Sequence, residues 1–283
     1  MRRSRYKPKK SSKLNYLAVI VVIGLVAYIL SAGAVGNWVS TNIIQPLLSA
    51  ETPTGAVTSD PTSPPQSQDQ DATPAPETRE LKVEAVSGYA IQVGAFSSDE
   101  NAGVAADEIK NRGGAGYIIK DGLVRVLAAA YNTEAEAKTV KERLLEEAGI
   151  ETSIYGLQVP ALNLKITSGD KAYEAINNCF KEYKTVSGEL GEIAYQYDKD
   201  SDSDAAKQQL KELRNRLRTA GDALLVVDED GEVVSGMKEL ISEAVAGMDE
   251  LIGAVEQGFS ANLKYRHINM IHSYSELVNK LTH

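Results

Sequence analysis

Planar polar and aromatic side chains alternate with aliphatic ones along several short stretches of the sequence. In residues 89–96, YAIQVGAF, Gln92 stands between Ile91 and Val93. Successive side chains of an extended strand point to opposite faces, so Gln92 lies on the face opposite the two aliphatic residues. An exposed amide both donates and accepts hydrogen bonds, which suits a hydroxyl-rich ligand. A solvent-facing glutamine without a ligand is the alternative, because antiparallel sheets commonly leave one face in water.

The same alternation adds a guanidinium, two tyrosines and small or aliphatic groups to the face that carries this amide. Aromatic rings can stack on the C–H face of a sugar, while planar polar groups beside them pair with its hydroxyls. This combination is what sugar recognition uses, although alternation alone favours a solvated face without a ligand. The expected residues of a sugar-binding face are Gln92, Tyr117, Arg125, Leu127, Ser153 and Tyr155.

No set of residues with the spacing of a catalytic or metal site accompanies this face. Of the three histidines, His267 and His272 are five residues apart, which is not the i, i+4 spacing of two ligands on one helical face. The aspartates of residues 198–204 resemble a calcium loop, but Ser203 replaces its glycine and Gln209 its final glutamate. We therefore predict no catalytic residue, no metal and no cofactor, and we expect a protein that is not an enzyme.

The elements that position the predicted face form an internal repeat with an offset of 35 residues, in which Ala95–Ala102 aligns with Ala130–Ala137. Ser97–Glu100 and Thr133–Glu136 have the capping-box spacing of helix starts. Between the two copies, Asp121-Gly122 suits a two-residue type I′ hairpin turn. The order βαβ-βαβ predicts an α+β fold with a four-stranded antiparallel sheet, two helices on one face, and the other face open.

Residues 161–283 have the periodicity of amphipathic helices. Apolar residues recur every three or four positions in four stretches, and acidic segments at 198–204 and 228–232 separate the first three. This pattern predicts an all-α antiparallel bundle of three or four helices, depending on whether Gly258 ends a helix. The single cysteine, Cys179, lies on an apolar stripe and is expected in the core.

The N-terminus predicts a membrane anchor. Residues 1–13 form a basic tail, and residues 14–35 carry no charge over a length that can cross a bilayer as one helix. The positive flank places the N-terminus in the cytoplasm and the remainder outside. We favour an uncleaved signal anchor over residues 14–36; a cleaved signal peptide, with a site at Ala32–Ala34, is the alternative.

A juxtamembrane segment and a disordered linker follow at residues 37–84. Residues 51–80 are rich in Pro, Ser, Thr, Asp and Gln and hold almost no large apolar side chain, so they cannot bury enough surface to fold. A flexible chain of about 30 residues spans about 30 Å. Beyond the basic tail 23 basic residues face 39 acidic ones, and this balance argues against nucleic acid as a partner.

The repeat resembles the SPOR (sporulation-related repeat) domain family over about residues 88–159. The family's first strand, aromatic-x-[Val/Ile]-Gln-Val-Gly-[Ala/Ser]-Phe, matches Tyr89–Phe96. One departure is Ala129, which stands where the family usually has a glycine. The bundle resembles no family that we can name. Further matching positions are Asn101–Ala102, Arg125–Val126, Tyr131 and Glu136–Ala137.

The resemblance implies an RNP-like domain at residues 85–160 that binds peptidoglycan through its open sheet face. SPOR domains prefer septal glycan strands stripped of their stem peptides, so the six residues above become glycan-binding candidates. The resemblance also implies a bacterial cell-envelope protein of division or sporulation. Together with the anchor, it predicts a single-pass protein of the cytoplasmic membrane with its C-terminal domains outside the cytoplasm.

Two hypotheses follow for the whole chain. In the first, the SPOR-like domain binds septal glycan and the bundle of residues 161–283 recruits an envelope protein. In the second, the chain is an interaction scaffold whose SPOR-like sheet no longer binds glycan. Convergence of Gln92, Arg125 and Tyr155 on one groove would favour the first.

Overall fold

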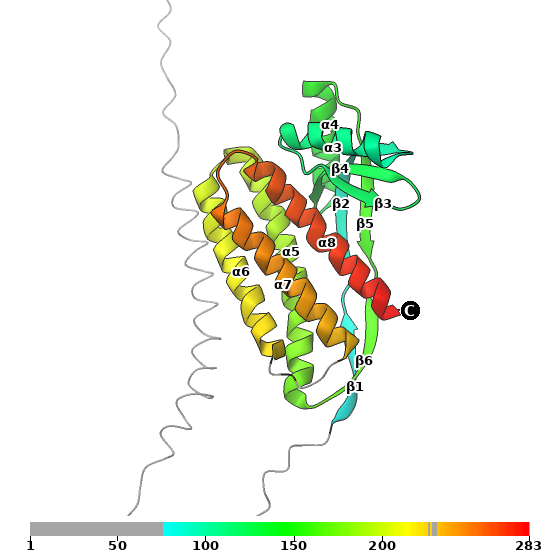
Figure 1. The fold of residues 1–283 in the computed structure, drawn as a ribbon, viewed down its shortest axis with the longest axis vertical. Coiled ribbons are helices and arrows are strands. Elements are labelled where there is room, and N and C mark those ends of the chain that lie inside the picture. Colours follow the sequence, from blue (N-terminus) through cyan, green and yellow to red (C-terminus); the bar gives the residue numbers. More distant parts are fainter. Residues whose placement is uncertain (1–75, 226, 228–230, 283) are drawn as a thin grey trace, which may run out of the picture. The chain divides into compact units, whose positions relative to one another are not determined.

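The repeat folds into the antiparallel sheet that the sequence predicts. The computed structural model describes residues 76–225, 227 and 231–282. Its larger sheet has the strand order β3-β4-β2-β5, with each neighbouring pair antiparallel (Figure 1). The elements of this part are β2 (Val86–Phe96), α3 (Asp99–Asn111), β3 (Tyr117–Lys120), β4 (Val124–Tyr131), α4 (Glu134–Ala148) and β5 (Ser153–Val159).

Helices α3 and α4 cover one face of this sheet, as predicted, but they do so over two separate apolar clusters. Ile91 of β2 packs with Ala137 and Val140 of α4. Val126 of β4 packs with Ala102 of α3. The predicted alternation is therefore confirmed for the inward-facing residues of the sheet.

Two compensating irregularities interrupt the pairing of β2 with β4. The register shifts on either side of Gln92, which leaves Ala128 of β4 and then Val93 of β2 without a direct partner. Because each strand carries one extra residue, the register recovers and Gln92 keeps its predicted outward orientation. Ala129, at the position where a glycine is expected, lies in this irregular stretch and is 6% exposed.

One of the two predicted helix caps is displaced by one residue. Thr133 and Glu136 form the predicted capping box of α4, and Gly149, with φ 65°, ends that helix. Helix α3 is capped by Ser98 and not by Ser97, since the Ser98 side chain accepts from the backbone of the first helical turn. Both helices thus begin where a hydroxyl satisfies an otherwise unpaired amide.

The β3–β4 hairpin differs from the predicted two-residue turn. Lys120 pairs with Val124, so three residues connect the strands. A type I′ turn requires positive φ at both central residues, whereas in this connection only Gly122 has one, at 89°. Asp121 keeps an ordinary backbone conformation, and its side chain makes the hydrogen bonds described below.

A second, two-stranded sheet pairs β1 (Glu77–Val83) with β6 (Leu162–Ser168) in antiparallel order. The predicted linker therefore ends before Glu77, and the segment predicted as a bundle begins with a strand. Leu81 of β1 is buried opposite Leu164 of β6. Neither strand alone buries its apolar residues, which is why two short segments so far apart in the sequence were not predicted as strands.

Four helices joined by short loops form the C-terminal bundle (Figure 1). The question left open by the sequence is settled at Gly258, which has φ 79° and directly precedes the last helix. Cys179 is fully buried, as predicted, and its thiol donates to the Ala220 carbonyl. The helices are α5 (Asp170–Asp200), α6 (Ser203–Leu225), α7 (Glu232–Gly253) and α8 (Phe259–Thr282).

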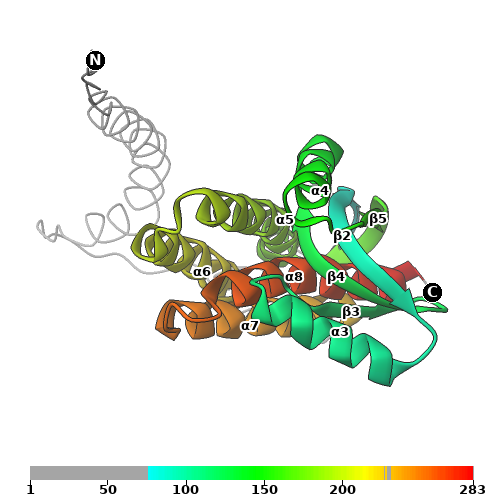
Figure 2. The same ribbon diagram turned by 90° about the horizontal axis from the view of Figure 1, so that it is seen from above.

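The second face of the larger sheet is not open, which corrects our expectation. Helix α8 crosses this face and contacts all four strands (Figure 1), and Figure 2 shows α8 next to β4. Leu127 and Ala90 on this face are 0% exposed. The Tyr117 hydroxyl donates to Asn269 Oδ1 at 3.1 Å and lies 3.0 Å from His272 Nδ1. Alternation correctly predicted the direction of these side chains, but they are buried against the bundle.

Within the described residues, no helix is long and apolar enough to cross a bilayer. The predicted anchor at residues 14–36 lies outside them, as do the basic tail and residues 37–75 of the predicted linker.

His267 of α8 is buried where α8 meets the sheet and α5. It is 1% exposed, and neither ring nitrogen has a hydrogen-bond partner in the described part of the chain. Gly191 of α5 leaves room for the ring, because a Cβ there would lie 2.5 Å from His267 Cε1. Burial lowers the pKa of His267 from 6.5 to about 4, and the backbone of Ala130 offsets only part of this effect. The folded protein therefore keeps His267 neutral.

We predict that His267 alone lowers the free energy of unfolding by about 2 kcal/mol between pH 7 and pH 5. Its folded pKa of about 4 is below its ordinary value of 6.5, so the unfolded chain binds this proton first. The stability is present above pH 6.5 and is lost as the pH falls toward 4. Urea denaturation at pH 7, 6 and 5 measures the change. His267→Gln, which does not titrate, should show a flatter profile, and identical profiles would contradict the prediction.

Candidate functional site

Predicted residues of the sugar-binding face come together at one uncovered corner of the sheet. Arg125 Nη1 donates to Gln92 Oε1 at 3.0 Å. The Arg125 guanidinium carbon lies 5.2 Å from the centre of the Tyr155 ring. Ser153 is exposed and pairs with Gln92 in the β2–β5 ladder. We call these four residues the exposed corner, and their convergence is the arrangement that favours glycan binding.

Asp121, which the sequence analysis treated only as a turn residue, organises the exposed corner. Its carboxylate accepts from Arg125 Nε at 2.7 and 3.0 Å and from the Tyr155 hydroxyl at 2.9 Å. The hydrogen bond from Arg125, followed by that from Tyr155, lowers the pKa of Asp121. Burial, and then the bond to Asp121, raises the pKa of Tyr155. At neutral pH a charged Asp121 therefore fixes both a cationic Arg125 and a protonated Tyr155.

The remaining two predicted residues lie under α8. Tyr117 is 6% exposed and Leu127 is 0% exposed. The ring of Tyr117 packs on Tyr265 of α8 with 4.8 Å between centres, and burial raises the pKa of the Tyr117 hydroxyl far above its usual value. Both side chains belong to the core between sheet and bundle, so we remove them from the set of accessible ligand contacts.

A cavity of about 200 Å³ adjoins the exposed corner, between β3, β5 and α8. Asp121 and Tyr155 line it from the sheet, and His272 and Ser275 line it from α8. Sequence reasoning missed the two helical residues because the periodicity of α8 indicates one apolar stripe, and nothing in it reveals a second partner. No signal in the sequence marked the acid, because i, i+4 neighbours meet on a helix whereas Asp121 and Arg125 lie in a hairpin.

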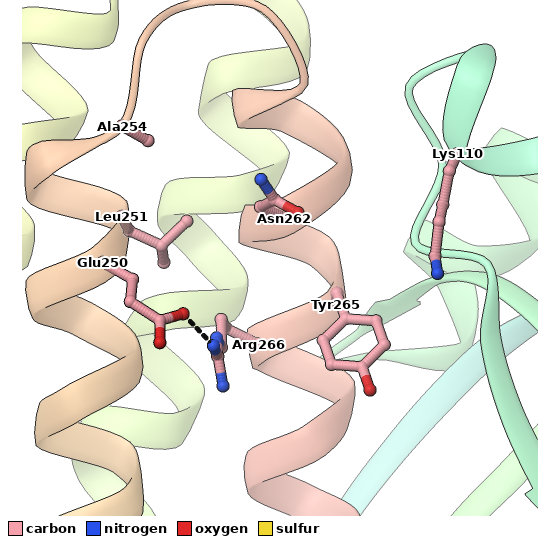
Figure 3. A pocket seen from close by; sticks show the side chains of 7 residues that line it. All are labelled: Lys110, Glu250, Leu251, Ala254, Asn262, Tyr265 and Arg266. Carbon is pink, nitrogen blue, oxygen red and sulfur yellow. Dashed lines mark hydrogen bonds and ion pairs between the residues drawn. The ribbon is translucent and has the colours of Figure 1, made fainter. Parts of the chain in front are cut away.

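Another cavity, of about 290 Å³, lies between α7, α8 and Lys110 of α3 (Figure 3). Glu250 of α7 pairs with Arg266 of α8 within it. Lys110 Nζ lies 5.8 Å from the centre of the Tyr265 ring. The one acid of this cavity is already paired, so the cavity offers no free acid–base couple. Across the described ranges, no group of three or more His, Cys, Asp or Glu residues is placed to hold a metal.

The family comparison agrees with this geometry. Residues 85–163 match the SPOR domain model. The match confirms the resemblance over the sheet and its two helices, and we use the name SPOR domain for this segment from here on. Peptidoglycan binding and septal targeting are properties of this family. No curated protein and no solved structure matches the chain.

We predict that Asp121→Asn lowers the pKa of Tyr155 and loosens Arg125. The substitution removes the negative charge that disfavours ionisation of Tyr155, while burial, the larger cause, keeps its pKa raised. An NMR titration of the Tyr155 ring carbons measures the change. Asp107→Asn, at an exposed position of α3, is the matched control and should leave that titration unchanged. An unaltered Tyr155 titration in Asp121→Asn would refute the role that we assign to Asp121.

Proposed function

We propose that this chain is a membrane-tethered envelope protein that binds peptidoglycan glycan strands through the exposed corner of its SPOR domain. The observation that carries the proposal is the convergence of Gln92, Arg125 and Tyr155 within a segment that matches the SPOR domain. We propose a binding role without enzymatic activity, at division or sporulation septa. Septal glycan stripped of its stem peptides is the proposed ligand.

The exposed corner offers a sugar both of the contacts that carbohydrates require. Tyr155 is partly exposed and supplies an aromatic surface. Gln92 and Ser153 supply an amide and a hydroxyl, each able to donate and accept. These groups stand on adjacent strands, β2 and β5, so a pyranose resting on the ring can reach both.

Arg125 suits a glycan from which peptides have been removed. Hydrolysis of the amide that joins a peptide to the sugar leaves a carboxylate on the glycan. Arg125 uses Nε for Asp121 and Nη1 for Gln92, and no hydrogen bond among the described residues uses its Nη2. That donor can pair with the new carboxylate, which gives a physical reason for preferring stripped strands.

We propose roles for the rest of the chain from its sequence. Residues 14–36 would anchor the protein in the cytoplasmic membrane with its N-terminus inside. The linker would let the SPOR domain reach a wall that lies away from the bilayer. The helical bundle would hold an envelope protein partner.

One observation favours the alternative scaffold function. Tyr117 and Leu127 are buried by α8, so two of the six expected glycan-binding residues are engaged by the chain itself. If the four uncovered residues are insufficient for glycan, the SPOR domain serves the bundle as a structural platform.

We predict that the full chain, in non-ionic detergent, sediments with purified sacculi and does so more strongly after amidase treatment. Gln92→Lys and Arg125→Ala should each weaken this binding by about tenfold, because each removes a hydrogen bond at the exposed corner. Gln208→Lys, on an exposed position of α6, is the matched control. Equal sedimentation of all variants, or none by the folded wild type, would reject glycan binding and leave the scaffold function.

We also predict that the full chain stays with membranes after alkaline carbonate extraction, and that a chain beginning at residue 37 is released. The uncharged stretch that would hold it is long enough to span a bilayer. Mass spectrometry of the extracted protein distinguishes an intact anchor from a cleaved signal peptide. Release of the intact full-length chain by carbonate would argue against the anchor.

A further inference from the structure

Helix α8 borders the exposed corner of the SPOR sheet and closes it on one side. A glycan strand running across the whole face would have to pass over Tyr117 and Leu127, which lie beneath this helix. The strand can occupy the exposed corner, but on the α8 side it meets Ile271, His272 and Ser275. A glycan strand can therefore extend from the exposed corner in one direction, because α8 blocks the other.

Packing and hydrogen bonding fix the position of α8 against the sheet. Gly88 of β2 lets Ile271 approach so closely that a Cβ at Gly88 would lie 2.8 Å from Ile271 Cδ1. Tyr117 holds Asn269 and His272 through its hydroxyl. Helix α8 also carries Tyr274, whose ring stacks on Tyr183 of α5 with 5.4 Å between centres. Displacing α8 would disrupt both the sheet contact and the bundle core.

The cavity on this closed side has the mixed lining that a sugar ring needs. Its apolar surface comes from Tyr155, Ile271 and the neighbouring aliphatic residues. Two polar side chains keep unused hydrogen-bonding capacity. Ser275 makes no side-chain hydrogen bond in the described structure, and His272 uses only Nδ1 for Tyr117.

The cavity and the exposed corner are adjacent, because Tyr155 belongs to both and Asp121 connects them. These two side chains are hydrogen-bonded to each other at 2.9 Å and line the cavity. Asp121 also binds Arg125 of the exposed corner. A ligand seated in the cavity can therefore continue onto the corner without leaving the sheet.

We infer that this protein recognises the end of a glycan strand, with the terminal sugar in the cavity against α8 and the next sugars on the exposed corner. The inference rests on the proposed glycan binding and narrows its ligand from strands in general to strand ends. The side chains from α8, His272 and Ser275, lie outside the segment that matches the SPOR domain. The bundle thus contributes to the specificity of the site.

The first test compares binding capacity with the number of strand ends. The full chain in non-ionic detergent is titrated onto amidase-treated sacculi before and after mild muramidase trimming, with new ends counted by borohydride labelling. The amount of protein bound at saturation, per mass of insoluble glycan, should rise in proportion to the ends. A capacity that stays constant or falls as ends increase would overturn the inference.

The second test fills the cavity. Ser275→Phe should lower the affinity for a peptide-free tetrasaccharide, released from the same sacculi by muramidase, by about tenfold. Ser273→Phe, the same change on the same helix in the groove facing α7, is the matched control and should bind as the wild type does. Ser275→Ala removes the hydroxyl from the cavity lining without adding volume and should also weaken tetrasaccharide binding.

The outcomes separate this inference from the proposed function. If Gln92→Lys abolishes binding to sacculi while both cavity variants bind the tetrasaccharide normally, glycan binding stands and end recognition is wrong. If the folded wild type binds neither sacculi nor the tetrasaccharide, both fail. Weakened tetrasaccharide binding in Ser275→Phe and Ser275→Ala, with normal binding by Ser273→Phe, supports end recognition.

Discussion

The packing of α8 on the outer face of the SPOR sheet is the constraint on which the rest of the structure depends. A sheet with apolar residues on both faces needs a cover on each. Helices α3 and α4 supply one, and α8 supplies the other by burying Ala90, Leu127 and Tyr117. Because α8 is also a core helix of the bundle, the sheet and the bundle share one apolar cluster. They form one structural unit, and a substitution at their contact affects both.

The exposed corner needs no covering element, because its polar side chains hydrogen-bond with one another and with Asp121. Asp121 gathers Arg125 and Tyr155, and Arg125 in turn orients Gln92. A guanidinium held in this way gives up little conformational entropy when a ligand arrives. Tyr155 also packs against the apolar cluster that the sheet shares with the bundle. The site is therefore preorganised by a single carboxylate at a hairpin turn.

Local patterns in the sequence were enough to predict the sheet, its two helices, the helical bundle and the direction of each outward side chain. They predicted Gln92, Arg125, Ser153 and Tyr155 at the site, because alternation depends only on neighbouring residues. They did not predict what covers Tyr117 and Leu127, since that contact joins residues about 150 positions apart. The pairing of β1 with β6 was missed for the same reason. Asp121 was misjudged because a two-residue turn was expected where three residues connect the strands.

The pairing of β1 with β6 determines how a pulling force would be transmitted through the protein. Under the proposed anchoring, the membrane pulls on the chain at Glu77 and a bound wall pulls near Gln92. The chain between these points is β1, two connecting residues and the first half of β2. Each strand is held from the side, β1 by β6 and β2 by both β4 and β5, so a pull along the strands is shared among many ladder hydrogen bonds. The bundle stands beside this line, and a partner bound to α6 or α7 would stay in place while membrane and wall move apart.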